Sequence, residues 1–501
     1  MTNSLIKLQN GSDIRGIAVE GVEGENVNLT PDAANKIAQA FAIWLSKKTK
    51  IPCEQLKIGI GRDARISGPD ILKAAVAGLV FKGVKVVDCS LATTPAMFMS
   101  IVFEQTKFDG AIMITASHLP FNRNGLKFFD KDGGLEHEDI TDILIEAEKC
   151  NVVNKDATVE TFDLLSLYSI HLKNSICREL GKSEADKPLL GLHIVVDAGN
   201  GDAGFFVDKI LKPLGADTSG SAFLVPDGMF PNHIPNPENK AAMQAIQNAT
   251  VNNKADLGLI FDTDVDRMSA VFSSGKEVNR DAIIALISAI LAKDYPGGTI
   301  VTDSVTSDRL TFFLEEKLGL KHYRYMRGYK NVIDKCKELN EKGIVCPLAM
   351  ETSGHGALKD NYYLDDGAFL AVKLVVALAK AKTQGKKIES LIENLPAPGE
   401  EGEFRFKIKA EDFKAYGKTV LEEFKKRAFA KGLDLPENFE GVRISFHSQD
   451  IEGWLLLRMS LHDPVMPLNV EGMRKGDRAK IVALTKELVS GFSELDTSCL
   501  K

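Results

Sequence analysis

The segment LGLIFDTDVDR, residues 257–267, starts as an apolar run and ends in three alternating carboxylates, Asp262, Asp264 and Asp266. A short apolar run bounded by polar residues is typical of a buried strand. In open α/β sheets, ligands bind at the carboxyl ends of the strands. Three carboxylates in an irregular loop can converge on one small cation, and Mg²⁺ prefers carboxylate and phosphate oxygens. The segment therefore predicts an α/β sheet that carries a metal loop.

Two other interpretations of this loop compete with metal binding. An EF-hand is excluded, because its sixth position would be Arg267 instead of glycine and its twelfth would be Ser273 instead of glutamate. A solvated acidic turn stays open on spacing alone. It is disfavoured because three charges at a buried strand end repel one another unless a cation is present.

The pattern of an apolar run followed by a polar loop recurs through the first two-thirds of the chain. It alternates with helical periodicity, which is typical of βαβ units. We expect strands at residues 56–60, 84–87, 111–114, 194–196, 257–261 and 299–301. Apolar residues at three- and four-residue spacing predict helices over residues 33–45, 282–291 and 369–381.

Composition and charge narrow the function classes. The 501 residues are 44% hydrophobic and 26% charged, which is typical of a globular protein of several domains. A net charge of −7 argues against nucleic-acid or anionic membrane partners. The N-terminus lacks a signal-like apolar stretch, no span approaches the roughly 20 apolar residues of a membrane helix, and seven scattered cysteines form no CxxC pair. We therefore expect a cytoplasmic protein with free thiols.

A glycine-rich segment, DAGNGDAG at residues 197–204, contains a formal G-x-G-x-x-G after a predicted strand. Such a motif binds dinucleotides in Rossmann folds, but it also occurs wherever a strand turns tightly into a helix. Asp217 lies at a Rossmann-like distance further on, but the chain offers no other dinucleotide signal and no GxxxxGK[ST] phosphate loop. We interpret the segment as a strand-to-helix turn.

Two further polar loops could carry chemistry. TASHLPFNRNGLK, residues 115–127, places Ser117, His118 and Lys127 close together after an apolar run, without the G-x-S-x-G geometry of lipases. ETSGH, residues 351–355, combines a carboxylate, a hydroxyl and an imidazole, which are partners for sugar hydroxyls by type. Taken singly, the first is more often a hydrogen-bonded turn, and the second could be a polar interdomain connection.

Taken in order, these segments resemble the α-D-phosphohexomutase family, which includes phosphoglucomutases, phosphomannomutases and phosphoglucosamine mutases. GSDIRG at residues 11–16 resembles the family's GTDGIRG, and GRDAR at residues 61–65 also fits. TASHLPFNRNGLK resembles the phosphoserine loop TASHNP…NG.K, and ETSGH resembles the sugar loop GE.SGH. DTDVDR resembles the metal loop DGDGDR, with Thr263 and Val265 in place of both glycines. The match spans almost the whole chain.

The resemblance implies an α/β fold of four domains around a central cleft. Three are α/β domains with mixed sheets, and the fourth is a smaller α+β domain at the C-terminus. We expect a phosphoserine-loop domain at residues 1–157, a metal-loop domain at 158–275, a sugar-recognition domain at 276–392 and a phosphate-binding domain at 393–501. A proline–glycine stretch at residues 396–399 accompanies the last boundary.

The resemblance also implies a mechanism in which Ser117 is phosphorylated and its phosphate joins Asp262, Asp264 and Asp266 around Mg²⁺. A hexose 1-phosphate or 6-phosphate of glucose or mannose is then converted through a hexose 1,6-bisphosphate, which also serves as the phosphorylating activator. Arg15 and Arg267 would hold phosphoryl oxygens. Lys127 and His118 are the candidates for proton transfer.

The remaining residues implied by the resemblance bind substrate. Glu351 and Ser353 would contact sugar hydroxyls, and the distal phosphate would be bound by Lys330, His355, Arg458, Ser460 and His462. The last loop departs from the family, because residues 458–464 read RMSLHDP where the family has RPSGTEP. Leu461 replaces a glycine and His462 replaces a threonine, so the phosphate must be held in a different way.

Three functions remain open. The first is an intramolecular phosphotransferase, a phosphoglucomutase or phosphomannomutase acting on a hexose phosphate. The second is a glucose-1,6-bisphosphate synthase using a sugar bisphosphate donor, which an altered phosphate loop would allow. The third is a non-catalytic sugar-phosphate-binding regulator, which the intact serine and aspartates disfavour. We expect a monomer or homodimer.

Overall fold

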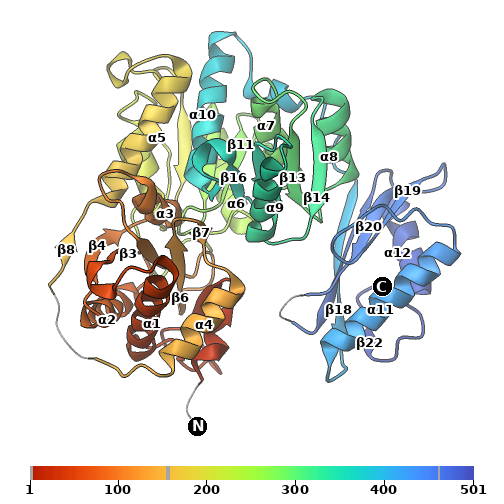
Figure 1. Cartoon of the computed structure of the whole chain (residues 1–501). Coiled ribbons are helices and arrows are strands. Elements are labelled where there is room, and N and C mark those ends of the chain that lie inside the picture. The colour runs from red at the N-terminus through yellow and green to blue at the C-terminus, as the bar shows by residue number, and fades with distance from the viewer. Residues whose placement is uncertain (1–3, 154–157, 461–462, 501) are drawn as a thin grey trace. The chain divides into compact units, whose positions relative to one another are not determined.

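The computed structural model describes residues 4–153, 158–460 and 463–500 (Figure 1). The chain divides into two compact units. Unit 1 comprises Met1–Asn279 and Ser353–Ser390, and unit 2 comprises Arg280–Thr352 and Leu391–Lys501. Within the described ranges, no helix is long and apolar enough for a bilayer crossing. All seven cysteines are free thiols, as the sequence predicts.

The N-terminal part of unit 1 is built on a mixed sheet. Its strands lie in the order β1 (Gln9–Asn10), β2 (Asp13–Ile17), β6 (Arg123–Asp130), β5 (Gly110–Ile114), β3 (Lys57–Arg62), β4 (Lys85–Leu91) and β8 (Glu160–Thr161), and β7 (Gly133–Gly134) pairs with β6. β3 is parallel to β4 and β5, whereas β6 is antiparallel to β5 and β2. The carboxyl ends of β3 and β5 therefore open at the same edge.

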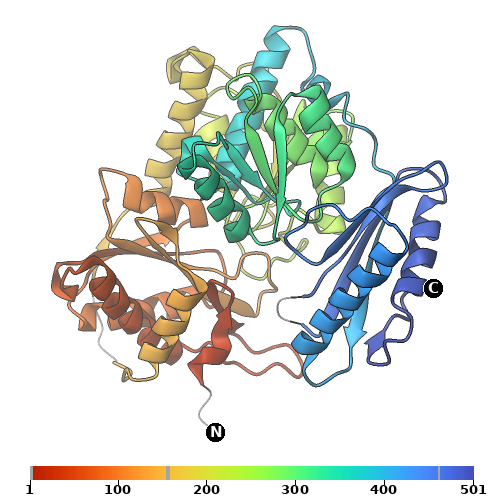
Figure 2. The ribbon, with the colours of Figure 1, turned by 45° about the vertical axis from the view of Figure 1, so that its right-hand side comes forward.

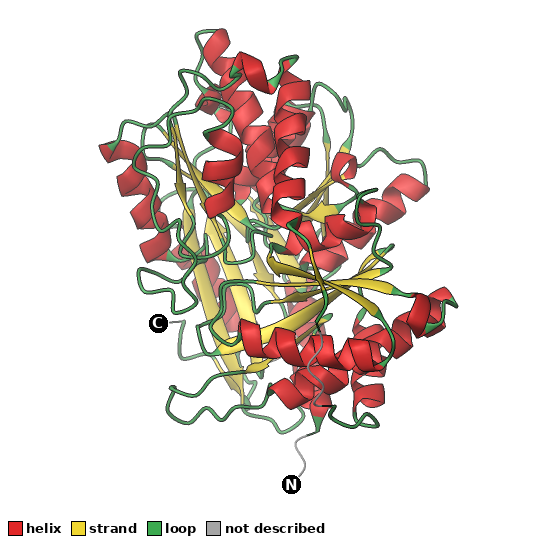
Figure 3. Cartoon of the chain, turned by 90° about the vertical axis from the view of Figure 1, so that its left-hand side faces the viewer, coloured by secondary structure: helices red, strands yellow, loops and turns green. Residues whose placement is uncertain are grey.

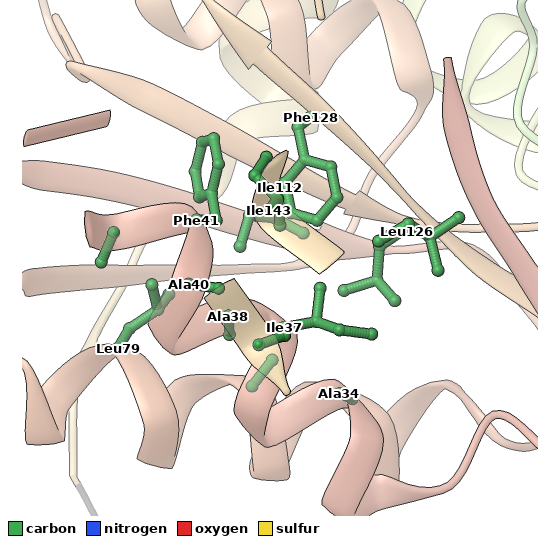
Figure 4. Packing of buried hydrophobic residues seen from close by; sticks show 14 of the residues in the cluster. Ala34, Ile37, Ala38, Ala40, Phe41, Leu79, Ile112, Leu126, Phe128 and Ile143 are labelled. Atoms are coloured by element: carbon green, nitrogen blue, oxygen red, sulfur yellow. The ribbon is translucent and has the colours of Figure 1, made fainter. Parts of the chain in front are cut away.

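Helices cover both faces of this sheet. α1 (Pro31–Thr49), α2 (Gly68–Phe81) and α4 (His137–Ala147) share one apolar core with β3, β5 and β6. α1 begins at a proline, and the Thr30 side chain caps it by accepting from Ala33 N. Figure 4 shows Phe41 of α1 beside Phe128 of β6, with ring centroids 4.7 Å apart. On the other face, α3 (Thr94–Val102) packs Phe98 against Phe129.

The second sheet of unit 1 carries the metal-type loop. Its order is β12 (Glu277–Val278), β11 (Met268–Phe272), β10 (Leu257–Phe261) and β9 (Ile194–Asp197), with β10 parallel to β9 and antiparallel to β11. Apolar residues of α6 (Lys240–Asn252) pack on one face of this sheet. Unit 1 also contains α5 (Leu164–Leu180), the hairpin of β16 (Gly356–Leu358) and β17 (Leu364–Asp365), and α10 (Gly367–Thr383).

Unit 2 begins with parallel strands. β13 (Thr299–Asp303) pairs with β14 (Lys321–Tyr325) and β15 (Leu348–Met350). α7 (Asp281–Leu291) leads into β13, and α8 (Asp308–Phe312) and α9 (Tyr329–Glu341) connect the strands. The C-terminal sheet is antiparallel, in the order β19 (Val442–His447), β20 (Glu452–Leu457), β21 (Val465–Gly472), β18 (Glu400–Ile408) and β22 (Leu495–Asp496). Figure 2 shows α11 (Phe413–Ala430) and α12 (Asp477–Leu488) beside it, and both contribute to its core.

The predicted α/β class with a C-terminal α+β part is confirmed, and long helices run beside the strands (Figure 3). Every strand and helix predicted from the sequence is present, with ends that differ by a few residues. The glycine-rich segment is a strand-to-helix turn, as predicted, because it joins β9 to a short π-helical segment at Phe206–Leu211. Gly199 and Asn200 in this turn have positive φ angles of 53° and 60°.

Candidate active site

Ser117 lies in the loop that follows β5 and is almost fully buried. Its hydroxyl donates a 2.9 Å hydrogen bond to Asp262 Oδ2 and lies 3.3 Å from His118 Nδ1. Its own N–H donates to Thr115 Oγ1 at 2.9 Å. The φ angle of Ser117 is 51°, a left-handed conformation that is uncommon outside glycine and that clusters at functional sites. The loop thus holds one hydroxyl against the aspartates.

Arg65, at the end of the GRDAR segment, anchors this loop. Its guanidinium is fully buried and donates to four loop carbonyls, those of Ser117, Leu119, Pro120 and Arg123. Asp63 Oδ2 accepts from Arg65 Nε at 3.1 Å and from the Thr115 hydroxyl at 2.7 Å. Sequence reasoning noted the segment but assigned no role to Arg65, because its partners come from a different strand end.

Asp262, Asp264 and Asp266 are buried, and one carboxylate oxygen of each lies within 4.8 Å of the others. Among the described residues, Oδ1 of Asp264 and Oδ1 of Asp266 have no hydrogen-bond partner. Burial, together with repulsion from Asp266 and Asp264, raises the pKa of Asp262 well above its usual range. These oxygens could hold a metal ion. We call Asp262, Asp264 and Asp266, together with Lys127 and Ser117, the serine–aspartate cluster.

Two cations lie against the aspartates. Lys127 Nζ is 3.0 Å from Asp264 Oδ2 and 2.6 Å from Asp266 Oδ2. Arg267 Nε is 3.8 Å from Asp262 Oδ2, and the Arg267 N–H donates to Asp262 Oδ1 at 3.1 Å. Although burial raises the pKa of Asp266, the charges of Lys127, His355 and Arg267 bring it below its usual range. The loop is therefore charged and densely polar.

Val265 occupies the position where the resembling family has its second glycine. Its φ angle is 67°, and its side chain is fully buried. For a β-branched residue this left-handed conformation is a genuine outlier, costing roughly 1–2 kcal/mol. The metal-type loop therefore keeps its left-handed backbone although the residue that favours it is absent.

The pKa values of two imidazoles near the aspartates are shifted in opposite directions. Burial, with the nearby charges of Arg267 and Arg15, lowers the pKa of His118 to about 2. Burial lowers the pKa of His355, but the charges of Asp365 and Asp266 together with the hydrogen bond to Asp365 raise it above its usual value. His355 Nδ1 also lies 3.9 Å from Asp266 Oδ1. The role of Asp365 had no sequence signal, because it stands simply as the last residue of a short strand.

The other predicted residues of unit 1 are also placed. Arg15 lies on β2 and pairs with Asp13 at 3.0 Å. Ser353 is buried, and its hydroxyl has no hydrogen-bond partner within the described part of the chain. Unit 1 therefore brings Ser117, His118, Lys127, Arg267 and His355 together around the three aspartates.

In unit 2, polar residues gather at the carboxyl ends of β13 and β15. Asp303 ends β13 and accepts from Thr352 N at 3.2 Å and from Thr352 Oγ1 at 2.9 Å. Glu351 follows β15, and its Oε1 accepts from Gly328 N at 2.7 Å. Burial and the charge of Glu351 raise the pKa of Asp303 to about 7. Arg327 Nε lies 4.0 Å from Asp303 Oδ2.

The residues predicted to bind the distal phosphate are also in unit 2, except for His355. Lys330 lies in the first turn of α9, and its Nζ is 3.3 Å from Asp334 Oδ2. Arg458 follows β20, and its Nη1 lies 3.6 Å from Glu440 Oε1. Ser460 N–H donates to Val465 O at 3.0 Å, which closes the loop. Leu461 and His462 lie outside the described residues.

Sequence comparisons match three consecutive families. They are described as phosphoglucomutase/phosphomannomutase alpha/beta/alpha domain I at residues 7–150, domain II at residues 167–275 and domain III at residues 279–398. The three matches together cover most of the chain. They contain the serine loop, the aspartate loop and the ETSGH segment, respectively.

Whole-chain relatives agree with these matches. A phosphoglucomutase/phosphomannomutase of Thermococcus kodakarensis is 30% identical, over 90% of this chain and 92% of its own. A phosphoglucomutase of Neisseria gonorrhoeae is 28% identical, over 92% and 91%. A crystal structure of a phosphoglucomutase/phosphomannomutase family protein from Burkholderia thailandensis has a TM-score of 0.78 at 25% identity and covers 98% of both chains. The chain therefore belongs to the phosphoglucomutase/phosphomannomutase family, whose members are α-D-phosphohexomutases.

Proposed function

We propose that this chain interconverts the 1-phosphate and 6-phosphate of glucose, mannose or both, through a phosphorylated Ser117 and a hexose 1,6-bisphosphate. The observation that carries the proposal is the 2.9 Å contact between Ser117 Oγ and Asp262 Oδ2, beside two buried aspartates. The names of the relatives, phosphoglucomutase and phosphomannomutase, support the choice of sugars.

The serine–aspartate cluster fits a divalent cation. The Oδ1 atoms of Asp264 and Asp266 are buried and lack donors in the described chain, and buried carboxylates need compensation. Asp262, Asp264 and Asp266 would hold Mg²⁺ together with an oxygen of the Ser117 phosphate. The ion would neutralise charge on the phosphoryl group during transfer.

In the transfer step, the bond between Ser117 Oγ and phosphorus breaks and a bond from phosphorus to a sugar hydroxyl oxygen forms. The hydroxyl proton passes to a base of the chain. His118 and Lys127 were the sequence candidates, but His118 has a pKa of about 2 and Lys127 is paired with two aspartates. His355 is the more basic imidazole, and Asp365 holds its Nδ1. His355, whose Nδ1 pairs with Asp365, is therefore a third candidate for this role.

The remaining residues orient the substrate. Arg15 and Arg267 contact non-bridging phosphoryl oxygens, for which guanidinium groups are well shaped. Glu351 and Ser353 bind sugar hydroxyls, while Lys330, Arg458 and Ser460 bind the phosphate that is not being transferred. One serine serves both directions, because the bisphosphate returns its other phosphoryl group to Ser117 after turning over.

The alternative of a glucose-1,6-bisphosphate synthase rests on Leu461 and His462. Since these residues lie outside the described chain, the role of His462 in phosphate binding and the synthase activity stay predictions. A sugar-phosphate-binding regulator without turnover would not require a buried serine hydroxyl against a metal-type cluster.

Intact-mass spectrometry after exposure to glucose 1,6-bisphosphate and mannose 1,6-bisphosphate tests the proposal. We expect a gain of one phosphoryl group, located on Ser117 by peptide mapping, and loss of that group when glucose 6-phosphate or mannose 6-phosphate is added. Product identification then separates the alternatives. Release of the hexose 1-phosphate supports a mutase, accumulation of bisphosphate supports a synthase, and no phosphorylation supports a regulator.

A further inference from the structure

Glu440 was not singled out by the sequence, yet it joins three strand ends of unit 2. It lies in the loop that leads into β19. Its Oε2 accepts from the Ser304 hydroxyl at 2.6 Å and from Arg327 N at 2.9 Å. Its Oε1 lies 3.6 Å from Arg458 Nη1. Ser304 follows β13, Arg327 follows β14 and Arg458 follows β20, so one carboxylate links loops of two sheets.

The neighbouring residue, Phe439, fastens the same loop by apolar contact. Its ring stacks on Tyr323 with centroids 5.5 Å apart and lies 5.1 Å from the Tyr325 ring. Both tyrosines belong to β14. Aromatic pairs at these distances stabilise beyond the area that they bury. The loop therefore has an apolar anchor and a polar anchor at adjacent positions, which restricts where the Glu440 carboxylate can lie.

The contact with Arg458 is an ion pair and not a hydrogen bond, because 3.6 Å exceeds hydrogen-bond distance. Arg458 Nε has no hydrogen-bond partner among the described residues. The guanidinium is thus held in place by charge while it keeps donors for another anion. The side chains of Arg458 and Glu440 are only 12% and 15% exposed, so solvent screens their attraction weakly.

Arg327 places a second positive charge near Arg458. Burial lowers the pKa of Arg458, the charge of Glu440 raises it, and the charge of Arg327 lowers it again. Two like charges at one edge repel each other, so Arg458 needs an opposite charge to remain there. Glu440 provides that charge from a fixed position.

We propose that Glu440 is a positioning residue that holds the Arg458 guanidinium ready for the substrate phosphate. The inference rests on the proposed function for the identity of that phosphate. Glu440 acts through Arg458 and does not compete for the site, since its Oε2 is committed to Ser304 and Arg327 N–H. Moving the carboxylate aside would leave these part-buried donors unpaired, which is costly.

The test separates loss of charge from loss of packing. Glu440→Gln keeps the length of the side chain and an oxygen that can accept from Ser304 and Arg327, but removes the charge. We expect the KM for glucose 6-phosphate to rise about 10-fold, the effect of losing a part-buried charge pair, while kcat changes little. Glu403→Gln is the matched control, because Glu403 also raises the pKa of Arg458 but hydrogen-bonds to Arg405 on the surface. It should leave KM unchanged.

A double-mutant cycle shows whether Glu440 works through Arg458. In an Arg458→Gln background, Glu440→Gln should add little to KM, because the partner is already gone. An unchanged or lower KM in Glu440→Gln, or an equal rise in both backgrounds, would overturn the inference. Circular dichroism and the thermal midpoint confirm that each variant is folded.

Calorimetric binding of inorganic phosphate makes the result independent of turnover. We expect the phosphate Kd to weaken about as much as KM in Glu440→Gln and to be unchanged in Glu403→Gln. Absence of turnover in the parent chain would reject the proposed function, whereas the phosphate measurement would still decide the role of Glu440. Equal phosphate affinity in the parent and in Glu440→Gln would overturn the inference.

Discussion

The serine–aspartate cluster of unit 1 is buried and the Glu440–Arg458 region of unit 2 is partly buried; both are charged, yet their polar groups are satisfied in different ways. In unit 2, Glu440, Glu351 and Asp303 each accept from N–H or O–H groups of the chain. In unit 1, two buried aspartate oxygens have no donor among the described residues. The carboxylates of the Glu440–Arg458 region are therefore satisfied by groups of the chain, whereas the serine–aspartate cluster leaves two carboxylate oxygens without a donor in the described residues, an arrangement that fits a cation.

The two regions should therefore respond differently to the loss of a side chain. Removing a group from a satisfied network leaves its partner unpaired, so the effect is local and passes through that partner. Under the proposed function, removing a group from the serine–aspartate cluster would remove a ligand of the ion or the carrier of the phosphoryl group, so the effect would appear in metal binding or in phosphorylation. The predictions below separate these two kinds of effect.

The largest effect is expected for Ser117→Ala, which removes the oxygen that we propose to carry the phosphoryl group. Turnover should be abolished and the protein should no longer gain a phosphoryl group by intact mass. The fold should survive, because only one hydroxyl is lost. Near-normal mutase activity in this variant, with folding verified by circular dichroism, would refute the assignment of the serine.

Replacing any one of Asp262, Asp264 or Asp266 by alanine should lower kcat by at least ~10²-fold, the loss of several kcal/mol of charge stabilisation. Mg²⁺ should raise the thermal midpoint of the parent chain, because an ion that binds only the folded state stabilises it. That rise should disappear in Asp264→Ala. Full activity in chelator, with metal removal verified by elemental analysis, would show that unit 1 needs no ion.

Arg65→Gln tests the anchor of the serine loop. Breaking a buried pair leaves Asp63 as an uncompensated charge, so the free energy of local unfolding should fall by about 3–5 kcal/mol. Hydrogen exchange of the amides at residues 115–123 measures this free energy of local unfolding. The matched control is Arg123→Gln in the same loop, whose part-exposed pair with Glu25 should contribute at most about 1 kcal/mol. Equal exchange rates in the two variants would show that Arg65 does not anchor the serine loop.

Arg458→Gln is the corresponding change in unit 2. The loss of a charged hydrogen bond to phosphate, about 1.5–3 kcal/mol, should raise KM roughly 10- to 100-fold. The Mg²⁺-dependent rise in thermal midpoint should be unchanged, since no ligand of the ion is touched. If that rise is lost as well, the two regions are not separate in the way that their hydrogen bonding indicates.

The smallest effect concerns His118 and pH. Its folded-state pKa of about 2 lies below the ordinary value of 6.5, so the unfolded chain takes up a proton that the folded chain does not. The contribution of the neutral His118 to the free energy of unfolding is fully present above pH 6.5. It falls as the pH drops toward the folded pKa, by up to about 1.4 kcal/mol per pH unit. In metal-free buffer, His118→Gln should therefore lose less stability than the parent between pH 6.5 and 5.5. Calorimetric midpoints with the same pH slope in both would contradict a buried neutral imidazole.

The positions of many strands and helices, the three aspartates and the family could be predicted from local sequence patterns. Strand and helix positions follow from apolar periodicity, which acts over a few residues, and β10 was placed at the residues that it occupies. Asp262, Asp264 and Asp266 were recognised because their spacing is itself local. The family followed from several such segments in the right order. Each of these patterns depends only on residues that are near one another in the sequence.

Other features depend on residues that are distant in sequence. Arg65 finds its four carbonyls more than fifty positions away, and Glu440 meets Ser304 more than a hundred positions away. Asp365 matters only because a hairpin brings it to His355. The left-handed backbone of Val265 runs against its own residue preference and is held by the surrounding loop.

The amino-acid sequence by itself thus determined the elements, the chemical groups at the strand ends and the family of the chain. Which of those groups have hydrogen-bond partners and which lack them became visible only in the folded arrangement. The physical reason is that propensity and periodicity are short-range, whereas burial, hydrogen-bond partners and pKa depend on how strands from distant parts of the chain come together.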